Sequence, residues 1–498
     1  MSNIAFRRVI SKRARGVLLF CMVLAVLAAL PVLTGQAAVI TVDTTDDEFN
    51  DGTDCSLREA IQAANTNADF GGCVGAGSYG TDTINLDAAT YTLTLAGAGE
   101  NANATGDLDI TSNMTIEGQG AHMTTIDGNG IDRVFDITDS NIVIINNVTI
   151  TGGSSTADGG GIRNFGDLTL LDGVAVDNNN TSGSANAGGI LNGAGGMLEI
   201  ENSTISNNTT DNDAGGIQNS GTLEMINSTI SGNTAAGDAG GIDNSGTVEL
   251  NNVTITDNTA AGGDGGGIFN DANLTFTLSN TIIADNNDND FSTPDCFTEV
   301  NGDLASDGFN ILGNNAGCGG LTDGVNGDQV GTGLSPINPM LGPLTNNGGT
   351  TETHLPQDGS PAIDAGRNGV PPSPAPTPTV GPTPTPTPIN SVSPSPSPLA
   401  AVEPSQAGSG PACEATDQRG EPRPVDLNDD GNAICDIGAV ERQTDDTGGG
   451  GDGGTGNCSI AGESVKVSSA AANVLISLIP AFAIGFRMLR KRARKIRK

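Results

Sequence analysis

The feature that most constrains this chain is a short pattern that is repeated five times between Gly159 and Ile283. Each copy contains a glycine, an isoleucine directly after it and an asparagine two positions later. The isoleucines are separated by 28, 27, 25 and 26 residues and stand at Ile162, Ile190, Ile217, Ile242 and Ile268. A repeat of this length is one supersecondary unit that cannot bury its apolar face alone, so the copies must stack on one another.

Two further apolar columns follow the isoleucine in each copy. One is formed by Leu168 and Leu170, Leu198 and Ile200, Leu223 and Met225, Val248 and Leu250, and Leu274 and Phe276; the other by Val176, Ile205, Ile230, Ile255 and Ile283. Alternation with a period of two over such short runs predicts β-strands. Three strands and three Gly/Asn/Asp corners per repeat describe one coil of an all-β parallel β-helix. Similar alternations between Thr83 and Ile150 bring the expected total to roughly seven to nine coils.

The asparagine of each copy shares a face with the isoleucine, because side chains two apart in a strand point the same way. Such asparagines can bond to one another from coil to coil as a ladder. They can also serve only to accommodate the turn that follows. Both interpretations are structural, and they concern Asn164, Asn192, Asn219, Asn244 and Asn270.

The composition agrees with a solenoid and excludes one class of partner. Glycine occurs 72 times, tryptophan is absent and aromatic residues make up 3 %, which is too few large side chains for a conventional core. The formal net charge is -37, and most basic residues lie near the two ends of the chain. Nucleic acid is therefore not an expected partner, because little positive charge is available to neutralise phosphates.

Both ends of the chain carry the composition of export and anchoring segments. Five basic residues precede an apolar run over 17–30, which predicts a signal peptide over 1–37 with cleavage near Ala37. The segment 467–486 is long enough to span a bilayer, and eight basic residues follow it. We therefore expect an exported chain that is held at the cell surface, or at the outer face of the membrane, by its C-terminus. Cys458 either is a processing or lipid-attachment residue, as in the bacterial C-terminal sorting signals that this end resembles, or is incidental to a permanent transmembrane anchor.

Six cysteines remain when Cys21 and Cys458 are set aside. An exported chain meets oxidising conditions, which favour disulfides over metal ligation. Six cysteines allow 15 connectivities, and proximity in the sequence favours the local pairs Cys55 with Cys73, Cys296 with Cys318, and Cys413 with Cys435.

A helix is expected just before the repeats. Ser56 and Glu59 have the spacing of a capping box, and the apolar residues that follow fall on one helical face: Leu57, Ala60, Ile61 and Ala64. A helix in this position can cover the open apolar end of a solenoid, so we predict an N-terminal capping helix.

The segment Cys55–Asn65, with the sequence CSLREAIQAAN, resembles the N-terminal motif of bacterial surface proteins with right-handed parallel β-helix repeats. The GGGI and N-x-T repeats are similar to those of polymorphic outer-membrane proteins and other adhesin-like proteins. Five later segments resemble the C-terminal module of bacterial surface proteins whose membrane anchor varies: 338–344, 347–349, 359–366, 416–420 and 435–441. The resemblance implies a right-handed, surface-anchored β-helix and no catalytic residues.

These features predict a sequence of segments. They are a signal peptide (1–37), an N-terminal cap with the first coils (38–105), the β-helix repeats (106–290), a disulfide-bearing C-terminal module (291–369 and 411–443) interrupted by a Pro/Thr/Ser-rich insert (370–410), a Gly-rich spacer (444–457) and the anchor (458–498).

Enzymatic activity has little support in the sequence. A polysaccharide lyase needs a base and usually a cation, yet residues 39–366 contain no lysine and only Arg58, Arg133 and Arg163. Arg133 and Arg163 are about one coil apart, and a surface pair of this kind is more often solvated than catalytic. A glycosidase needs two carboxylates at a fixed separation, and nearly all acids lie in Gly/Asn corners. We therefore predict no catalytic residues.

Two acidic patterns raise the hypothesis of bound calcium, the one cofactor expected. The first pattern comprises Asp426, Asn428, Asp430, Asn432 and Asp436. Its oxygen ligands have the spacing of a calcium loop, but the final glutamate is absent. The alternative is a plain Asx-Gly turn without an ion. The second is a column four residues before the signature isoleucines, where Asp213, Asp238 and Asp264 either line a calcium-binding edge or splay apart as turn residues.

Together these observations predict an adhesin-like or structural protein of the cell surface without catalytic activity. The expected partners are a glycan or protein ligand outside the cell and the membrane, through the C-terminal segment. The alternative is a polysaccharide lyase or glycoside hydrolase that acts on extracellular glycans.

Overall fold

The computed structural model describes residues 37–367, except 51, 139, 272–274, 290–291 and 300–301, together with 412–426 and 433–444. All of these residues belong to one compact unit, Met1–Thr447. The predicted signal peptide up to residue 36, the Pro-rich insert, the spacer from residue 445 and the anchor with Cys458 lie outside the described residues. No helix within the described ranges is long and apolar enough to cross a membrane.

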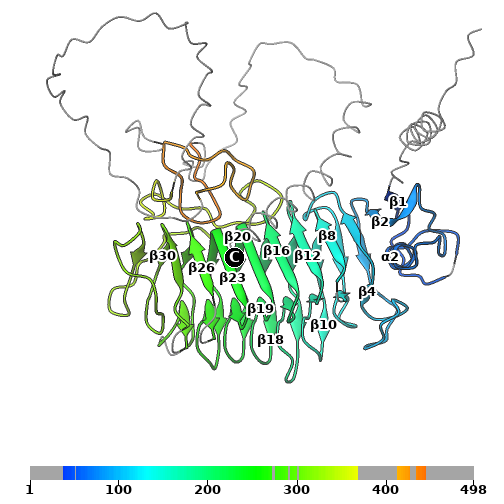
Figure 1. Cartoon of the computed structure of the whole chain (residues 1–498), viewed down its shortest axis with the longest axis horizontal. Coiled ribbons are helices and arrows are strands. Elements are labelled where there is room, and N and C mark those ends of the chain that lie inside the picture. Colours follow the sequence, from blue (N-terminus) through cyan, green and yellow to red (C-terminus); the bar gives the residue numbers. More distant parts are fainter. Residues whose placement is uncertain are drawn as a thin grey trace, which may run out of the picture. The chain divides into compact units, whose positions relative to one another are not determined.

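The signature isoleucines lie in one parallel sheet of eight strands, one strand per coil (Figure 1). The register pairs each signature isoleucine with the next, so the predicted apolar column is confirmed. Eight stacked strands fall within the expected number of coils. We call this the signature sheet; its strands are β4 (Leu108–Ile110), β7 (Phe135–Ile137), β11 (Ile162–Asn164), β15 (Ile190–Asn192), β19 (Ile217–Asn219), β22 (Ile242–Asn244), β25 (Ile268–Asn270) and β28 (Cys296–Thr298).

The other two predicted strands of each coil form two further parallel stacks, which merge where β20 and β23 run through both. The first stack comprises β1 (Ala37–Thr41), β2 (Ser78–Asn85), β5 (Met114–Glu117), β8 (Ile142–Asn146), β12 (Asp167–Leu171), β16 (Met197–Glu201), β20 (Thr222–Ser231), β23 (Thr247–Thr256), β26 (Phe276–Ser279) and β29 (Ala305–Gly308). The second comprises β3 (Thr90–Thr92), β6 (Thr125–Asp127), β9 (Thr149–Thr151), β13 (Ala175–Asp177), β17 (Thr204–Ser206), the ends of β20 and β23, β27 (Ile282–Ile283), β30 (Ile311–Leu312) and β31 (Gln329–Val330).

Five central coils contain a fourth, two-residue strand that the sequence did not predict. These strands form a short parallel sheet before the glycines of the next copy: β10 (Ser154–Ser155), β14 (Asn180–Thr181), β18 (Thr209–Thr210), β21 (Thr234–Ala235) and β24 (Thr259–Ala260). The solenoid also continues past the predicted end at residue 290, because β28 pairs in parallel with β25 and β30 with β27.

The core is one continuous cluster of inward-facing side chains from the stacked strands. Ile217, Leu223 and Ile230 represent the three columns of one coil, and each is 0 % exposed. Burying one such side chain stabilises the fold by about 1.5–3 kcal/mol. The aliphatic columns therefore provide the core that the few aromatic residues cannot.

The predicted asparagine ladder is confirmed in the signature sheet. Each buried amide donates from Nδ2 to Oδ1 of the next asparagine over 2.7–2.9 Å, in the order Asn164, Asn192, Asn219, Asn244 and Asn270. The last of them donates to the carbonyl oxygen of Gly302 over 2.6 Å. Because all five residues are fully buried, the ladder meets hydrogen-bonding requirements that water cannot meet.

A second buried ladder lies at the corner after the third strand and was not predicted. Its amides donate from Nδ2 to the next Oδ1 over 2.9–3.1 Å and end on the carboxylate of Asp295: Asn179, Asn208, Asn233, Asn258 and Asn286. Each Nδ2 also donates to a backbone carbonyl of the preceding coil, as Asn233 does to Ile205 over 3.0 Å. The ladder therefore joins side chains and backbone of successive coils.

The predicted helix forms as α2 (Leu57–Thr66), with both hydrogen bonds of the capping box between Ser56 and Glu59. Its predicted apolar face is buried, and the helix contacts β2 and β4. Its role as a cap for the open end of the solenoid stays a prediction.

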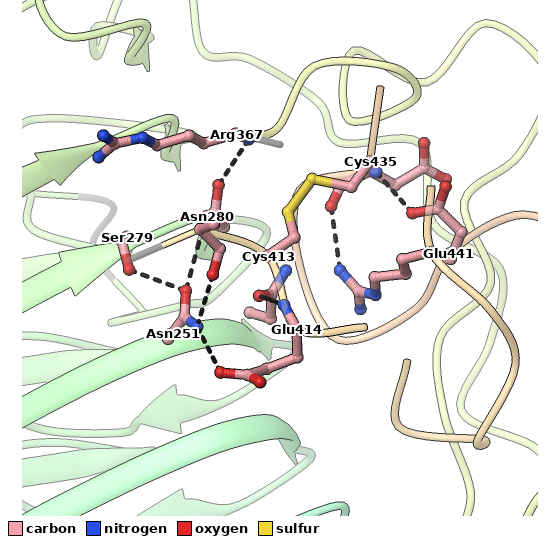
Figure 2. Close-up of a disulfide and its surroundings, with 12 residues drawn as sticks. Asn251, Ser279, Asn280, Arg367, Cys413, Glu414, Cys435 and Glu441 are labelled. Carbon is pink, nitrogen blue, oxygen red and sulfur yellow. Dashed lines mark hydrogen bonds between the residues drawn. A yellow bond between two sulfur atoms is a disulfide. The ribbon is translucent and has the colours of Figure 1, made fainter. Parts of the chain in front are cut away.

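The three predicted disulfides are confirmed: Cys55 with Cys73, Cys296 with Cys318, and Cys413 with Cys435. The third lies in the C-terminal module, where the backbone N–H of Cys413 donates to the carbonyl oxygen of Arg367 over 2.8 Å. Figure 2 shows Arg367 beside Asn280 of the solenoid, and the backbone N–H of Arg367 donates to Asn280 Oδ1 over 2.8 Å. The same view shows Glu414 beside Asn251, whose Nδ2 donates to Glu414 Oε1. The module is therefore bound to the coils on both sides of the predicted insert.

Gln418 makes the most extensive of these contacts. Its amide donates to Thr204 Oγ1 over 2.8 Å and to Thr351 Oγ1 over 3.0 Å, and accepts from Thr229 Oγ1 over 2.6 Å. In the same strand position of the next coil, Thr254 Oγ1 accepts from the backbone N–H of Ala439 over 3.0 Å. The threonines of three successive N-x-T sequences thus form the strip on which the module docks.

Replacing Ile217 with aspartate should lower the free energy of unfolding by about 3–5 kcal/mol, because an unpaired carboxylate would enter the apolar column. Urea denaturation followed by circular dichroism measures the change. The matched control is Thr247→Asp, which places the same charge at an exposed position of the next coil and should change stability far less. Equal stability of Ile217→Asp and the wild type would contradict the register.

Replacing Asn233 with alanine should lower the free energy of unfolding by at least about 2 kcal/mol, since it leaves the N–H and Nδ2 groups of Asn208 without their acceptor. The exposed neighbour Asn207 has a positive φ of 52°, so Asn207→Gly provides a control with a much smaller expected loss. The same urea titration compares them, and similar losses for the two variants would show that the second ladder contributes little.

Candidate functional site

Three aspartates converge at the N-terminal end of the solenoid. Asp109 is the central residue of β4 and Asp136 the central residue of β7, and the parallel register pairs them directly. Asp107 lies just before β4, two residues from Asp109. One carboxylate oxygen from each of the three lies within 4.8 Å of the others. We call these residues the aspartate cluster; each is at most 1 % exposed.

Two arginines contact the cluster. Arg133 donates from Nη1 to Asp107 Oδ2 over 2.8 Å. Arg163, which follows Asp136 in the same register column, donates from Nε to Asp136 Oδ1 over 2.9 Å and from Nη2 to Oδ2. The expectation of a solvated surface pair fails for Arg133, which is 4 % exposed, whereas the Arg163 side chain is 28 % exposed; both are paired with buried acids.

Burial changes the protonation of the cluster. It raises the pKa of Asp109 to about 7; the N–H of Asn103 opposes the shift, and the charges of Asp107 and Asp136 add to it. Burial also raises the pKa of Asp107 to about 6, although Arg133 acts in the opposite direction. These carboxylates therefore lie in a site where negative charge is costly.

The segment before β4 and the helix α2 cover the cluster. The backbone N–H of Asn103 donates to Asp109 Oδ2 over 2.8 Å, and Asn103 Nδ2 donates to the carbonyl oxygen of Arg58 over 2.8 Å. Arg58 donates to the carbonyl oxygens of Gly106 and Asp107 over 2.9 Å each, while its own charge is paired with Asp47. Arg58 is thus a buried structural residue that holds the backbone of Asp107 in place.

This burial limits the chemistry of the cluster. Two carboxylates close together, one with a raised pKa, are typical of glycoside hydrolases, but a polysaccharide cannot reach groups that are at most 1 % exposed. Sequence reasoning missed the cluster because it compared outward positions only in coils with the glycine signature. The signal lies at the central positions of the two preceding strands, which are occupied by Asp109 and Asp136.

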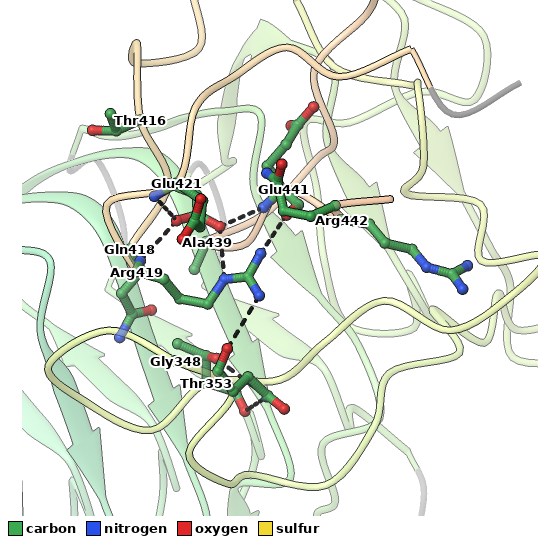
Figure 3. Close-up of polar contacts among 12 residues, drawn as sticks. Gly348, Thr353, Thr416, Gln418, Arg419, Glu421, Ala439, Glu441 and Arg442 are labelled. Atoms are coloured by element: carbon green, nitrogen blue, oxygen red, sulfur yellow. Dashed lines mark hydrogen bonds and ion pairs between the residues drawn. The ribbon is translucent and has the colours of Figure 1, made fainter. Parts of the chain in front are cut away.

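The first predicted calcium site lies only partly within the described residues. Asn428, Asp430 and Asn432 lie outside them, whereas Asp426 and Asp436 are described. Asp436 is buried and its carboxylate accepts backbone N–H groups of Asp364 over 2.8 Å and of Arg442 over 2.7 Å. In the same module Arg419 pairs with Asp417 over 2.9 Å, and its Nη2 donates to the carbonyl oxygen of Glu441 (Figure 3). Calcium in this loop stays a prediction.

The second predicted calcium site is a half-buried column in which each acid contacts the next coil. Asp213 Oδ1 accepts the backbone N–H of Asp238 over 2.9 Å, and Asp238 Oδ1 accepts that of Asp264 over 2.7 Å. Burial raises the pKa of Asp238; the N–H of Asp264 opposes the shift, and the carboxylates of Asp213 and Asp264 add to it. The bonding to turn backbone is thus observed, and calcium at this edge stays a prediction.

His354 forms a buried contact between the C-terminal module and the solenoid. Its Nδ1 lies 2.7 Å from the carbonyl oxygen of Gly342, which can only accept, so Nδ1 carries the proton. Nε2 then accepts from the hydroxyl of Ser231 on β20 over 2.8 Å. Burial lowers the pKa of His354, although the Gly342 bond and the charges of Asp257 and Glu352 oppose the shift. The folded state therefore favours the neutral ring.

Lowering the pH should weaken the contribution of His354 to stability. Because its pKa is lower in the folded chain than its usual 6.5, this contribution is complete above pH 6.5 and is lost as the pH falls through the folded-state value. The difference in melting temperature between the wild type and His354→Gln should therefore shrink between pH 7.5 and pH 5. The exposed His122 provides the control His122→Gln; a difference for His354→Gln that does not change with pH would contradict the assignment.

Comparison of the chain with protein-family models, curated proteins and solved structures finds no match. The functional conclusion therefore depends on the fold and on the geometry of the residues described above.

Proposed function

We propose that this chain is an exported protein of the cell surface whose β-helix acts as an adhesin-like or structural element without catalytic activity. The observation that carries the proposal is the set of three disulfides: Cys55 with Cys73 near the N-terminal helix, Cys296 with Cys318 in the last coils, and Cys413 with Cys435 in the C-terminal module. Such bonds persist in oxidising compartments outside the cytosol. The predicted signal peptide and C-terminal anchor agree with this location.

The surface of the signature sheet supports a binding or structural role. Outward positions at the centre of successive strands carry unrelated side chains: Arg163, Gln218, Asp243, Phe269 and Phe297, together with Leu191, which is only 8 % exposed. Phe269 and Phe297 stack with ring centroids 5.2 Å apart. A row of varied side chains at regular spacing can contact an extended glycan or protein ligand over several coils.

The alternative, a polysaccharide lyase or glycoside hydrolase, has one observation in its favour, namely the convergence of Arg133 and Arg163 on three carboxylates. The burial of the three carboxylates counts against an enzyme, because a catalytic acid must come within hydrogen-bond reach of the substrate. Turnover of an acidic polysaccharide that is lost in Arg133→Ala and in Arg163→Ala would establish the alternative in place of our proposal.

Protease treatment of intact cells that express the full chain tests the location. Proteinase K should remove an epitope inserted at the exposed residue Gly183, while a tag after Lys498 should be protected or, if the anchor is processed, absent. Permeabilised cells provide the control for protease access. An epitope that survives in intact cells and disappears after permeabilisation would overturn the proposal.

A further inference from the structure

The surroundings of the aspartate cluster carry more negative than positive charge. Asp107, Asp109 and Asp136 are joined by Asp132, whose charge acts on Asp107 and which is 3 % exposed. Two arginines contact this group, so its formal charge with all acids ionised is -4 + 2 = -2. The third nearby cation, Arg58, is paired with Asp47. Burying two uncompensated charges is costly, and one divalent cation would neutralise both.

Several oxygen atoms at this place have no hydrogen-bond partner. Asp107 Oδ1 and Asp109 Oδ1 are buried without a donor, as is Asp132 Oδ2. The side-chain oxygen of Asn103 is also unpartnered, although the residue is 0 % exposed and its backbone N–H is bonded to Asp109. Buried acceptors are nearly always satisfied in native proteins. One donor of the cluster, Arg133 Nε, is also buried without a partner, so the unpartnered oxygens outnumber the unpartnered donors, and one cation would satisfy several of these oxygens at once.

The spacing of the oxygens suits one ion. Calcium binds oxygen ligands at about 2.3–2.6 Å, so ligands on opposite sides of the ion are about 4.6–5.2 Å apart. Oxygens of Asp107, Asp109 and Asp136 that lie within 4.8 Å of one another can thus all contact one calcium ion. Calcium also accepts amide oxygens and irregular geometry, and Asn103 is held beside the cluster by the bond from its backbone N–H to Asp109 Oδ2.

We propose that Asp107, Asp109 and Asp136 bind a calcium ion that joins the first two strands of the signature sheet and the segment covering them. This site is distinct from both calcium sites that the sequence predicts. The ion would connect β4 with β7 and, through Asn103, with the loop that is bonded to α2. The inference does not depend on the ligand or the location of the protein.

The test uses the purified full chain at pH 7.5 after treatment with a chelator. Equilibrium dialysis with calcium counts the bound ions, and thermal melting compares calcium chloride with magnesium chloride and with sodium chloride at equal ionic strength. Asp109→Asn removes one ligand charge with little change of shape. Asp238→Asn is the matched control, because it makes the same change in the half-buried acidic column and leaves the aspartate cluster intact.

We expect Asp109→Asn to bind one calcium ion fewer than the wild type, or to bind it at least tenfold more weakly, and to lose the extra rise in melting temperature that calcium produces over sodium. Without calcium this variant should melt no lower than the wild type, because a buried charge has been removed. If it does not fold, Asp136→Asn must show the same loss.

Three outcomes would overturn the proposal. The first is equal calcium binding by Asp109→Asn and the wild type. The second is loss of the calcium response in Asp238→Asn alone, which would assign the ion to the acidic column. The third is an identical response to calcium and sodium, which would mean that ionic screening and protonation of Asp109 neutralise the cluster without a bound cation.

Discussion

The structure depends on hydrogen bonds between buried amide side chains of successive coils. In both ladders the bonds between side chains run one way: every asparagine donates to the next side chain or terminal acceptor, and each one after the first accepts from the asparagine before it, so each ladder has a direction. It must end on a group that only accepts, and the two ladders end on the Gly302 carbonyl and the Asp295 carboxylate. Because each member serves two neighbours, the loss of one leaves both with unsatisfied groups in a medium of low dielectric constant. The ladders thereby fix the register of coils whose aliphatic columns alone would tolerate displacement.

Much of the fold could be predicted because the relevant residues recur at a constant phase. The isoleucine column, the first ladder and the capping box follow from spacing that one sequence displays. The second ladder recurs as regularly, three residues after Val176, Ile205 and Ile230, but it directly follows corner residues with positive φ such as Asn178 and Asn207. Asparagine in that context is a common turn former, so its inward orientation was not apparent. The two-residue strands recur as well, with four of the five directly after Asn179, Asn208, Asn233 and Asn258, but two residues are too few to show the alternation that identifies a strand.

The aspartate cluster could not be predicted for a different reason. Asp109 and Asp136 meet only once the register of β4 and β7 is known, and these strands lack the glycine signature that aligns later copies. Their burial depends on Arg58, which is 49 residues from Asp107, and burial changes an ordinary pair of acids into an unusual site. The N-x-T repeats were likewise visible, but their use as a docking strip depends on Gln418, more than 180 residues beyond Thr229.

The bond between Arg367 and Cys413 has a consequence for how this protein can vary. The two residues that flank the Pro/Thr/Ser-rich segment are already joined by their backbones, and both are connected to the solenoid or to the disulfide of the module. The entropic cost of closing the loop between these two residues increases by about 0.6 kcal/mol for each doubling of its length. Insertions, deletions and repeat expansions between these residues should be nearly neutral for stability, which leaves the length and composition of the segment free to diverge.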